Sequence, residues 1–181
     1  MKAIATEIPG VLIFESPVFR DLRGSFQELF SLRGLKELGV DIDWKQDNLS
    51  VSQNNVIRGL HYQIVQPQAK FVQVVRGAVF DVAVDLRRTS PTFGRHVSVE
   101  LKAGDGKAFF IPVGFAHGFA ALEPETAFLY KVSDYYAPEG DRTVLWNDPE
   151  LGIDWRVRPE DAVVSAKDQA GTPLRNAEVF A

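Results

Sequence analysis

The chain has 181 residues, of which 45% are hydrophobic and 24% are charged, and its formal net charge at pH 7 is -4. This balance is typical of a globular protein, and the length suits a single domain over residues 1–181 with an apolar core. Basic residues are mixed with acidic ones rather than gathered in a stripe, which argues against nucleic acid as a partner, and no apolar run approaches the ~20 residues that a membrane helix needs.

The sequence contains no cysteine. Disulfides, thiolate ligands to metals and a cysteine nucleophile are therefore excluded together. The first ten residues, MKAIATEIPG, lack the apolar centre of a signal peptide. We expect a soluble, cytoplasmic protein that binds neither nucleic acid nor membrane.

Short strands dominate the pattern along the chain. Apolar residues recur at every second position, as in VFDVAVDL, where Phe80, Val82 and Val84 share one face while Asp81 and Asp85 lie on the other. Glycine, proline and aspartate at the junctions indicate turns. The predicted strands are residues 10–16, 47–52, 56–63, 69–75, 79–86, 95–101, 108–113, 117–122 and 126–133.

Helix is rare in this pattern. The segment SLRGLKELG fits one short helix, with Ser31 as its N-cap and Gly39 as its stop. Residues 134–160 are rich in proline, glycine, tryptophan and aspartate, and we expect them to form an irregular cover over one end. Many short strands with almost no helix predict an all-β fold, an antiparallel sandwich or barrel with one or a few short helices.

Three histidines are the first candidates for chemistry. His96 occupies the outward position of an alternating strand, which favours a surface role. His61 lies in a run otherwise suited to burial, and His117 lies at the turn into a predicted strand. Either of these two could be a core histidine bonded to a backbone carbonyl, or a functional group.

Metal catalysis is not favoured. Many small β-barrels hold a metal through an H-x-H pair and a distant histidine, but Gln63 stands where the second histidine of that pair would be needed. His61 and His117 supply two nitrogen ligands, fewer than the three protein ligands typical of a catalytic zinc site. We therefore expect no metal.

Acid–base catalysis is the chemistry that the remaining residues could perform. A histidine oriented by a carboxylate can accept a proton near neutral pH, a tyrosine in a closed site can donate one, and a lysine can neutralise an oxyanion. Arginine suits a substrate phosphate. Strict alternation would place Arg58 and His61 on opposite faces unless Gly59 bends or bulges the strand. The candidates besides these are Tyr130, Tyr135, Tyr136, Lys70, Lys131, Arg23 and Lys167.

Nine motifs, taken in chain order, resemble the dTDP-4-dehydrorhamnose 3,5-epimerase family, nucleotide-sugar epimerases of the cupin superfamily. The resemblance runs from about residue 5 to residue 175. The motifs are DLRGSFQE (21–28), QDNLS (46–50), VIRGLHYQ (56–63), QPQAKFVQVVRGAVFDVAVDLR (66–87), SPTFGR (90–95), PVGFAHGF (112–119), LYKVSDYYAPEGDR (129–142), WNDPELGIDW (146–155) and SAKDQ (165–169).

The resemblance implies a cupin-type jelly roll, a homodimer, no metal or organic cofactor, and epimerisation of dTDP-4-dehydro-6-deoxyglucose at C3 and C5 on the route to dTDP-rhamnose. It implies that His61 is the base and Asp168 its carboxylate partner. It also implies that Tyr130 is the acid on the opposite face and that Lys70 stabilises the enolate oxygen. One such set can serve both carbons, because removing either proton places the charge on the same C4 oxygen.

Substrate contacts are implied in the same way. Arg58 would bind the phosphates and Tyr136 would stack on thymine. Leu22 and Leu49 stand where polar residues are common in the family, and Asp141 stands where glutamate is usual. The full set of implied substrate-binding residues is Arg23, Phe26, Glu28, Gln46, Asn48, Arg58, His117, Tyr136, Asp141 and Lys167.

Two alternative functions stay open at this point. One is a single-carbon epimerase or a ketoisomerase acting on the same dTDP-4-keto-6-deoxy sugar, and the other is a non-catalytic cupin-type binding domain. The motif around His61 argues against a ketoisomerase. The joint presence of His61, Lys70, Tyr130 and Asp168 argues against binding alone, which would not require all four.

Overall fold

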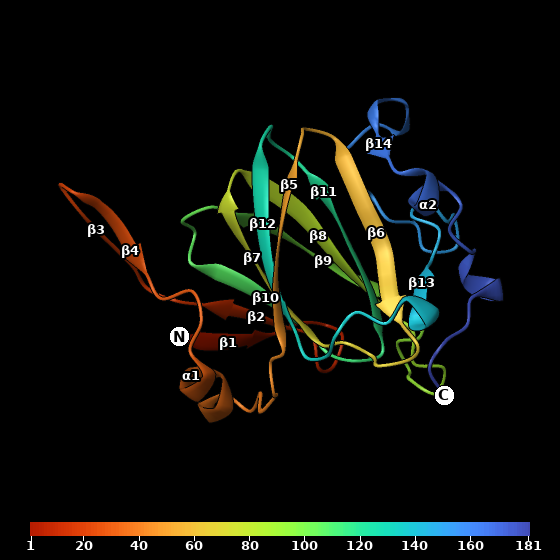
Figure 1. Cartoon of the computed structure of the whole chain (residues 1–181), viewed down its shortest axis with the longest axis horizontal. Coiled ribbons are helices and arrows are strands. Elements are labelled where there is room, and N and C mark those ends of the chain that lie inside the picture. The colour runs from red at the N-terminus through yellow and green to blue at the C-terminus, as the bar shows by residue number, and fades with distance from the viewer.

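Two antiparallel sheets face each other in the computed structural model, which describes all 181 residues (Figure 1). Sheet I contains, in spatial order, β1 (Lys2–Ala5), β2 (Leu12–Glu15), β10 (Lys107–Ile111), β7 (Lys70–Arg76), β12 (Thr126–Val132) and β5 (Gln46–Ser52). Sheet II contains β13 (Asp141–Thr143), β6 (Val56–Gln63), β11 (Phe115–Ala121), β8 (Ala78–Asp85) and β9 (His96–Lys102), and β14 (Val163–Val164) pairs with β6. The predicted antiparallel jelly roll is confirmed.

Apolar side chains fill three layers around these sheets. Between the sheets, side chains such as Phe109 and Phe128 of sheet I meet Leu101 of sheet II. The outer face of sheet II is covered by the C-terminal third of the chain, including Trp146 and Trp155. Because sheet II is therefore buried on both faces, its strands carry few exposed side chains.

The outer face of sheet I is covered only in part. Helix α1 (Leu32–Glu37) packs Leu35 against Phe71 of β7 and Phe110 of β10. The hydroxyl of Ser31 accepts a hydrogen bond from the amide of Gly34, so the predicted N-cap is confirmed. No helix of the structure is long and apolar enough to cross a membrane.

Residues 134–160, predicted as an irregular cover over one end, instead cover the outer face of sheet II and supply its strand β13. The cover continues to the C-terminus. It contains one further short helix, α2 (Ala166–Gln169), and three 3₁₀ turns, Pro138–Gly140, Pro159–Asp161 and Leu174–Asn176. Helix α2 lies next to β6 (Figure 1). The cover therefore brings residues from 166 onward to a strand more than 100 positions earlier in the chain.

A hairpin of β3 (Val18–Asp21) and β4 (Gly24–Gln27) forms its own two-stranded sheet. It projects away from both large sheets (Figure 1). Neither this hairpin nor β1 was among the predicted strands, because β3 and β4 bury no side chain and β1 is exposed throughout. Period-two burial is the signal on which strand prediction relies, and these strands lack it.

Gly59 bends β6. Without such a bend, strict alternation would place Arg58 and His61 on opposite faces of the strand. Opposite β6, strand β11 pairs His117 with His61 but Phe119 with Arg58, so β6 has one extra residue at this point, a β-bulge. The φ angle of Gly59 is +127°, and a Cβ there would lie 2.5 Å from the Cα of Gly118. Only glycine fits this position without strain.

Candidate active site

His61 and Asp168 form a hydrogen-bonded pair at one wall of the barrel. The Nε2 atom of His61 lies 2.6 Å from Oδ1 of Asp168. The Ser165 hydroxyl caps α2 by accepting from the Asp168 amide, which fixes the backbone that carries the carboxylate. Because Asp168 takes the Nε2 side of the ring, Nδ1 is the nitrogen of a neutral His61 that can accept a proton.

Asp168 is buried, yet it stays ionised. Burial opposes its charge, but hydrogen bonds from His61, the Gly59 amide and Ser165, together with the charge of His61, outweigh that effect and lower the pKa of Asp168. The second carboxylate oxygen accepts from the Gly59 amide at 3.3 Å. The β-bulge at Gly59 therefore also positions Asp168, the partner of His61, through the Gly59 amide.

Tyr130 and Lys70 reach the same cavity from the facing sheet. Tyr130 lies on β12 and Lys70 on β7, both in sheet I, whereas His61 lies on β6 of sheet II. Burial raises the pKa of Tyr130, with the charge of Arg58 acting against this, so the phenol keeps its proton at neutral pH. The cavity has a volume of about 190 Å³ and is lined by Ser50, Arg58, His61, Lys70, His117, Phe119, Phe128 and Tyr130.

A second hollow of about 190 Å³ continues from the first, since His61, Lys70 and Tyr130 line both. Its outer end is formed by Tyr136, Asp141 and Lys167. The Tyr136 hydroxyl donates to Asp141 at 3.2 Å, and Lys167 forms an ion pair with the same carboxylate. The two hollows together form an elongated site, with His61, Lys70 and Tyr130 where they join.

His117 forms a second histidine–aspartate pair, deeper than the first. Its Nε2 atom lies 2.8 Å from Oδ1 of Asp81, and both side chains are buried. Burial lowers the pKa of His117, although the neighbouring Asp81 acts in the opposite direction. Burial has the opposite effect on the acid Asp81, whose pKa it raises. His117 is therefore a neutral imidazole that donates Nε2–H to Asp81 and keeps Nδ1 as an acceptor.

Arg58 is held at the cavity by a residue that the sequence analysis did not name. Its Nε donates to the Ser52 hydroxyl at 3.0 Å. Ser50, two positions earlier on β5, lines the cavity with a buried hydroxyl that has no hydrogen-bond partner. The alternation Asn48, Ser50, Ser52 was the available signal, because it gives one face of a predicted strand a row of short polar groups.

Asp81 was also missed as a site residue. Its position in the VFDVAVDL alternation separates it from Phe80 and Val82, as predicted, but both faces of β8 are buried. The face of Asp81 is the one that lies between the sheets, beside Val79 and Ala83. Alternation indicated which residues share a face, and could not indicate that this face borders the cavity.

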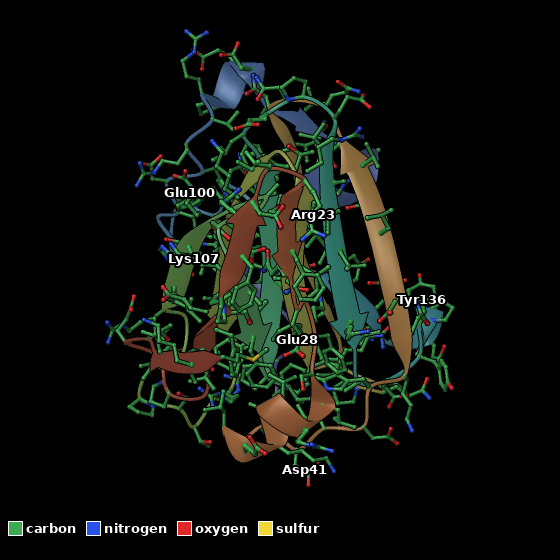
Figure 2. The ribbon with its side chains drawn as sticks, turned by 90° about the vertical axis from the view of Figure 1, so that its left-hand side faces the viewer. Arg23, Glu28, Asp41, Glu100, Lys107 and Tyr136 are labelled. Carbon is green, nitrogen blue, oxygen red and sulfur yellow. The ribbon has the colours of Figure 1, made fainter.

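Several residues expected to bind substrate lie away from this site when a single chain is considered. Arg23 and Phe26 belong to the projecting hairpin, and Glu28 follows it directly. Arg23 pairs with its neighbour Asp21 instead. Figure 2, in which the hairpin faces the viewer, shows Arg23 and Glu28 well separated from Tyr136 at the far edge.

Gln46 and Asn48 lie on the edge strand β5. The Gln46 amide donates to Asn48 at 2.7 Å. Asn48 is the cross-strand partner of Tyr130, so the two side chains share the inward face of sheet I. This places Asn48 beside Tyr130, although Asn48 does not line either hollow.

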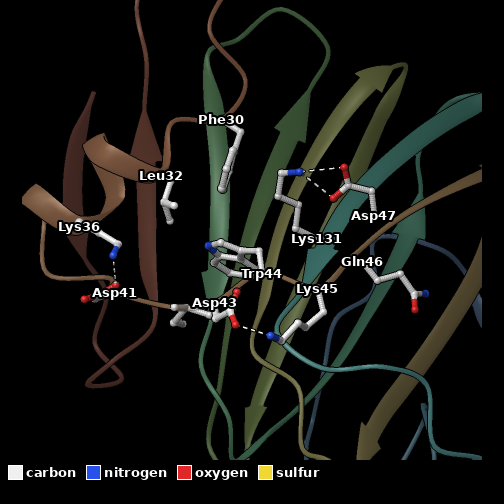
Figure 3. Close-up of a pocket in the computed structure, with 11 residues that line it drawn as sticks. Phe30, Leu32, Lys36, Asp41, Asp43, Trp44, Lys45, Gln46, Asp47 and Lys131 are labelled. Atoms are coloured by element: carbon white, nitrogen blue, oxygen red, sulfur yellow. Dashed lines mark hydrogen bonds and ion pairs between the residues drawn. The ribbon is translucent and has the colours of Figure 1, made fainter.

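A larger hollow of about 550 Å³ lies outside the barrel, near α1 (Figure 3). Its aromatic residues are Phe30 and Trp44, and the Lys131 ammonium lies 4.5 Å from the centre of the Phe30 ring. Its three lysines are each paired with an aspartate, in the pairs Lys131–Asp47, Lys45–Asp43 and Lys36–Asp41. With no histidine or tyrosine in its lining, it offers no acid–base pair.

The structure offers no ready metal site. No group of three or more His, Cys, Asp or Glu side chains is placed to hold a metal ion. Each histidine of the cavity has a single carboxylate beside it.

Comparison with known proteins points to one family. A family model described as dTDP-4-dehydrorhamnose 3,5-epimerase matches residues 5–176. The protein of that name from Pseudomonas aeruginosa is 48% identical over 181 residues, covering 99% of both chains, and the one from Methanothermobacter thermautotrophicus is 44% identical over 180 residues, covering 99% of this chain and 97% of its own. The crystal structure of dTDP-6-deoxy-D-glucose-3,5-epimerase from Legionella pneumophila, in complex with dTDP-4-keto-L-rhamnose, has a TM-score of 0.94 at 44% identity and covers 98% of this chain and 94% of that one.

Proposed function

The chain belongs to the dTDP-4-dehydrorhamnose 3,5-epimerase family, and from that premise we propose which of its residues perform each step. It is an isomerase that inverts C3 and C5 of dTDP-4-dehydro-6-deoxyglucose, a reaction of dTDP-rhamnose biosynthesis. The relatives named above give no support to a ketoisomerase or a non-catalytic binding domain. We also propose a cytoplasmic location, because a charged nucleotide sugar is excluded from a bilayer.

The observation that carries the proposal is the placement of acid and base on facing sheets. Inversion at a carbon requires that the proton leaves from one side and returns from the other. His61 projects from sheet II and Tyr130 from sheet I, and both line the cavity between them. A sugar ring lying in this cavity would present opposite faces to the two side chains.

The first step is removal of a proton next to the C4 ketone. The Nδ1 atom of His61 takes the proton from C3 or C5, and the electron pair of the broken C–H bond moves to the C4 oxygen. Asp168 stabilises the imidazolium that forms and keeps the ring in the required tautomer. No other cavity group combines an unprotonated nitrogen, partial exposure and an ionised partner.

The second step returns a proton to the opposite face. Lys70, whose ammonium is buried beside His61, stabilises the enolate oxygen. The phenol of Tyr130 gives its proton to the carbon as the C4 carbonyl re-forms. The proton on His61 then passes through solvent to the tyrosinate, which restores both groups for the second carbon.

The remaining site residues suit the nucleotide. Arg58, held by Ser52, offers a forked guanidinium for phosphate at the inner hollow. Tyr136 lies at the outer end, where an exposed aromatic ring suits stacking on thymine.

A homodimer completes the proposed site. The hairpin carrying Arg23 and Phe26 extends from the body without touching the cavity of its own chain, and Phe19, Leu22 and Phe26 on it are exposed. The outer face of sheet I also leaves Leu49, Val51 and Val75 exposed. A second copy that covers this face buries these apolar side chains and brings Arg23 to the neighbouring diphosphate.

The function is tested by incubating the protein with dTDP-4-dehydro-6-deoxyglucose in deuterated water. NMR should show inversion with deuterium at both C3 and C5. Deuterium at only one carbon would contradict the 3,5-epimerase assignment, and deuterium at neither would contradict the whole mechanism.

The dimer is tested separately through the hairpin. Sedimentation should show a dimer, and Arg23→Ala should keep the dimer but weaken the binding of dTDP by about 10-fold or more, as expected for a lost charge-assisted contact. Arg20→Ala, on the same hairpin but bonded to the Gly104 carbonyl, is the matched control and should leave dTDP affinity unchanged. A monomer, or equal affinity in Arg23→Ala and wild type, would contradict this part of the proposal.

A further inference from the structure

Lys70 is a buried lysine without an ion-pair partner. Its side chain makes one hydrogen bond, in which Nζ donates to the backbone carbonyl of His61 at 3.3 Å. The residue is 9% exposed. An ammonium taken out of water at this depth loses its proton unless a negative charge lies near it.

The charged and titratable groups around Lys70 come from every element that borders the two hollows. Most are basic or neutral, and the nearby carboxylates are Asp81, Asp141 and Asp168. The full set is Arg58, His61 and Tyr62 on β6, Asp81 on β8, His117 on β11, Tyr130 on β12, Asp141 on β13, Lys167 and Asp168 on α2, and Tyr136 in the loop before β13.

Two of these three carboxylates are engaged elsewhere. Asp141 forms an ion pair with Lys167 and accepts from Tyr136. Both oxygens of Asp168 accept hydrogen bonds, one with His61 and one from the Gly59 amide. The charge of Asp141 is therefore balanced by Lys167, and Asp168 has no oxygen left without a hydrogen bond.

Asp81 differs from both, and its hydrogen-bond partner His117 lines the same cavity as Lys70. Asp81 is 0% exposed, its Oδ1 meets His117, and its Oδ2 is buried with no hydrogen-bond partner. Because His117 is a neutral donor, the negative charge of Asp81 is not cancelled by it. Asp81 is therefore the carboxylate of the three that has neither a cationic partner nor a hydrogen bond at each oxygen.

We propose that Asp81 is a positioning residue that keeps Lys70 in its charged form, so that an ammonium is already present when the enolate oxygen develops. The role assigned to Lys70 rests on the proposed function, but the electrostatic coupling between the two side chains does not. Asp81 itself need not touch the substrate.

The titration behaviour of both groups agrees with this coupling. Burial lowers the pKa of Lys70 to about 8, while the charge of Asp81, and after it that of Asp141, holds it up. Burial raises the pKa of Asp81, and His117 and Lys70 act against that rise. Without the charge of Asp81, Lys70 loses its proton at a lower pH and is neutral over more of the working range.

The direct test follows the lysine itself, in the intact protein without substrate. NMR of ¹³C-labelled lysine side chains, with Lys70→Met used to assign the signal, gives the midpoint of the Lys70 titration. Asp81→Asn should lower this midpoint by about 1 pH unit or more, the size expected for loss of a close opposite charge. Asp141→Asn, the matched control, removes a charge already paired with Lys167 and should lower it less.

A second variant guards against failure of Asp81→Asn to fold. Coupling between two titrating groups is reciprocal, so Lys70→Met should raise the midpoint of the Asp81 carboxyl in the same kind of experiment. An unchanged Lys70 midpoint in folded Asp81→Asn, or an unchanged Asp81 midpoint in Lys70→Met, overturns the proposal.

Turnover adds a readout that a purely structural role would not move. In Asp81→Asn the alkaline limb of the pH profile of kcat should shift to lower pH, in the same direction as the Lys70 midpoint. A uniform loss of kcat at all pH values, with the limb unmoved, overturns the positioning role. If the wild-type protein turns over no dTDP-sugar, the proposed function fails, and the substrate-free titration still decides the coupling.

Discussion

Two histidine–aspartate pairs lie side by side in this protein and differ in depth and in the hydrogen bonds of their aspartates. His61 and His117 are direct cross-strand partners on β6 and β11, and each contacts its aspartate through Nε2, at 2.6 and 2.8 Å. The His61 side chain is 34% exposed, whereas that of His117 is 7% exposed. The same two residue types, in the same orientation, therefore occur once at the cavity surface and once in the interior.

The aspartates differ more than the histidines. Asp168 has both oxygens satisfied, and these bonds lower its pKa despite burial, whereas burial raises the pKa of Asp81, which has one oxygen unpartnered. The role that we propose for His61 depends on an Asp168 that stays anionic and on the nearby solvent. A histidine beside Asp81 is kept neutral. Hydrogen-bond count and solvent access, rather than the pair itself, assign the roles.

The largest expected effect comes from removing the charge of the outer pair. Asp168→Asn should lower kcat by about 10²- to 10⁴-fold, because the amide neither stabilises a charged His61 nor enforces its tautomer. Stopped-flow or NMR turnover measures this. Asp154→Asn, at an exposed carboxylate, is the control and should behave like wild type. A loss below 10-fold in Asp168→Asn would show that the outer pair does not need its carboxylate.

Tyr130→Phe sharpens the comparison by leaving the outer pair to act alone. His61 can still remove a proton and return it to the same face, so deuterium should still enter the substrate. Net inversion should fall about 100-fold, the lower range for loss of a general acid. Parallel NMR measurements of exchange and inversion separate the two. Wild-type inversion in this variant would mean that Tyr130 is not the acid.

The stability of the two aspartate variants should depend on pH with opposite signs. The lowered pKa of Asp168 stabilises the folded wild type above the ordinary value of 3.8, by about 1–3 kcal/mol relative to Asp168→Asn, and this advantage disappears as pH falls through the lowered pKa. The raised pKa of Asp81 means the reverse: wild type should gain stability relative to Asp81→Asn as pH falls towards 3.8.

Urea unfolding at a series of pH values measures both differences. The sign of each slope is what matters, since the absolute cost of either substitution includes changes in packing and hydrogen bonding. Equal slopes for the two variants would remove the electrostatic distinction between the pairs.

Treatment with a chelator should leave activity unchanged. Neither pair has a third His, Cys, Asp or Glu placed to complete a metal site. Activity after exhaustive treatment with a chelator should equal the untreated value. A loss that zinc, iron or manganese restores would mean that one of the pairs binds a metal.

The sequence predicted much of the barrel and parts of the site. Alternation located most strands of the two large sheets, and Ser31 located the start of α1. Gly59 was identified as the residue that must bend for Arg58 and His61 to converge, and the bulge is there. These features depend on neighbours in sequence, where backbone preference and side-chain period act directly.

Other features depend on contacts that no local pattern encodes. Asp168 lies 107 residues from His61, and only the family resemblance joined them before the structure did. Asp81 was visible as the polar residue of an alternating strand, but the cover over sheet II, which makes both faces of β8 interior, is built from residues after 140. The projecting hairpin has no period-two pattern of apolar residues in the sequence, because none of its side chains is buried.

The most direct test of the central claim replaces one histidine at a time and measures deuterium incorporation into the substrate. His61→Asn, His117→Asn and the control His96→Asn are incubated with dTDP-4-dehydro-6-deoxyglucose in deuterated water and followed by NMR. Because we propose that only the outer pair cycles its charge, His61→Asn should incorporate no deuterium at C3 or C5. His117→Asn should still incorporate it, more slowly, and His96→Asn should match wild type. Deuterium incorporation in His61→Asn together with its loss in His117→Asn would contradict the assignment of the two pairs.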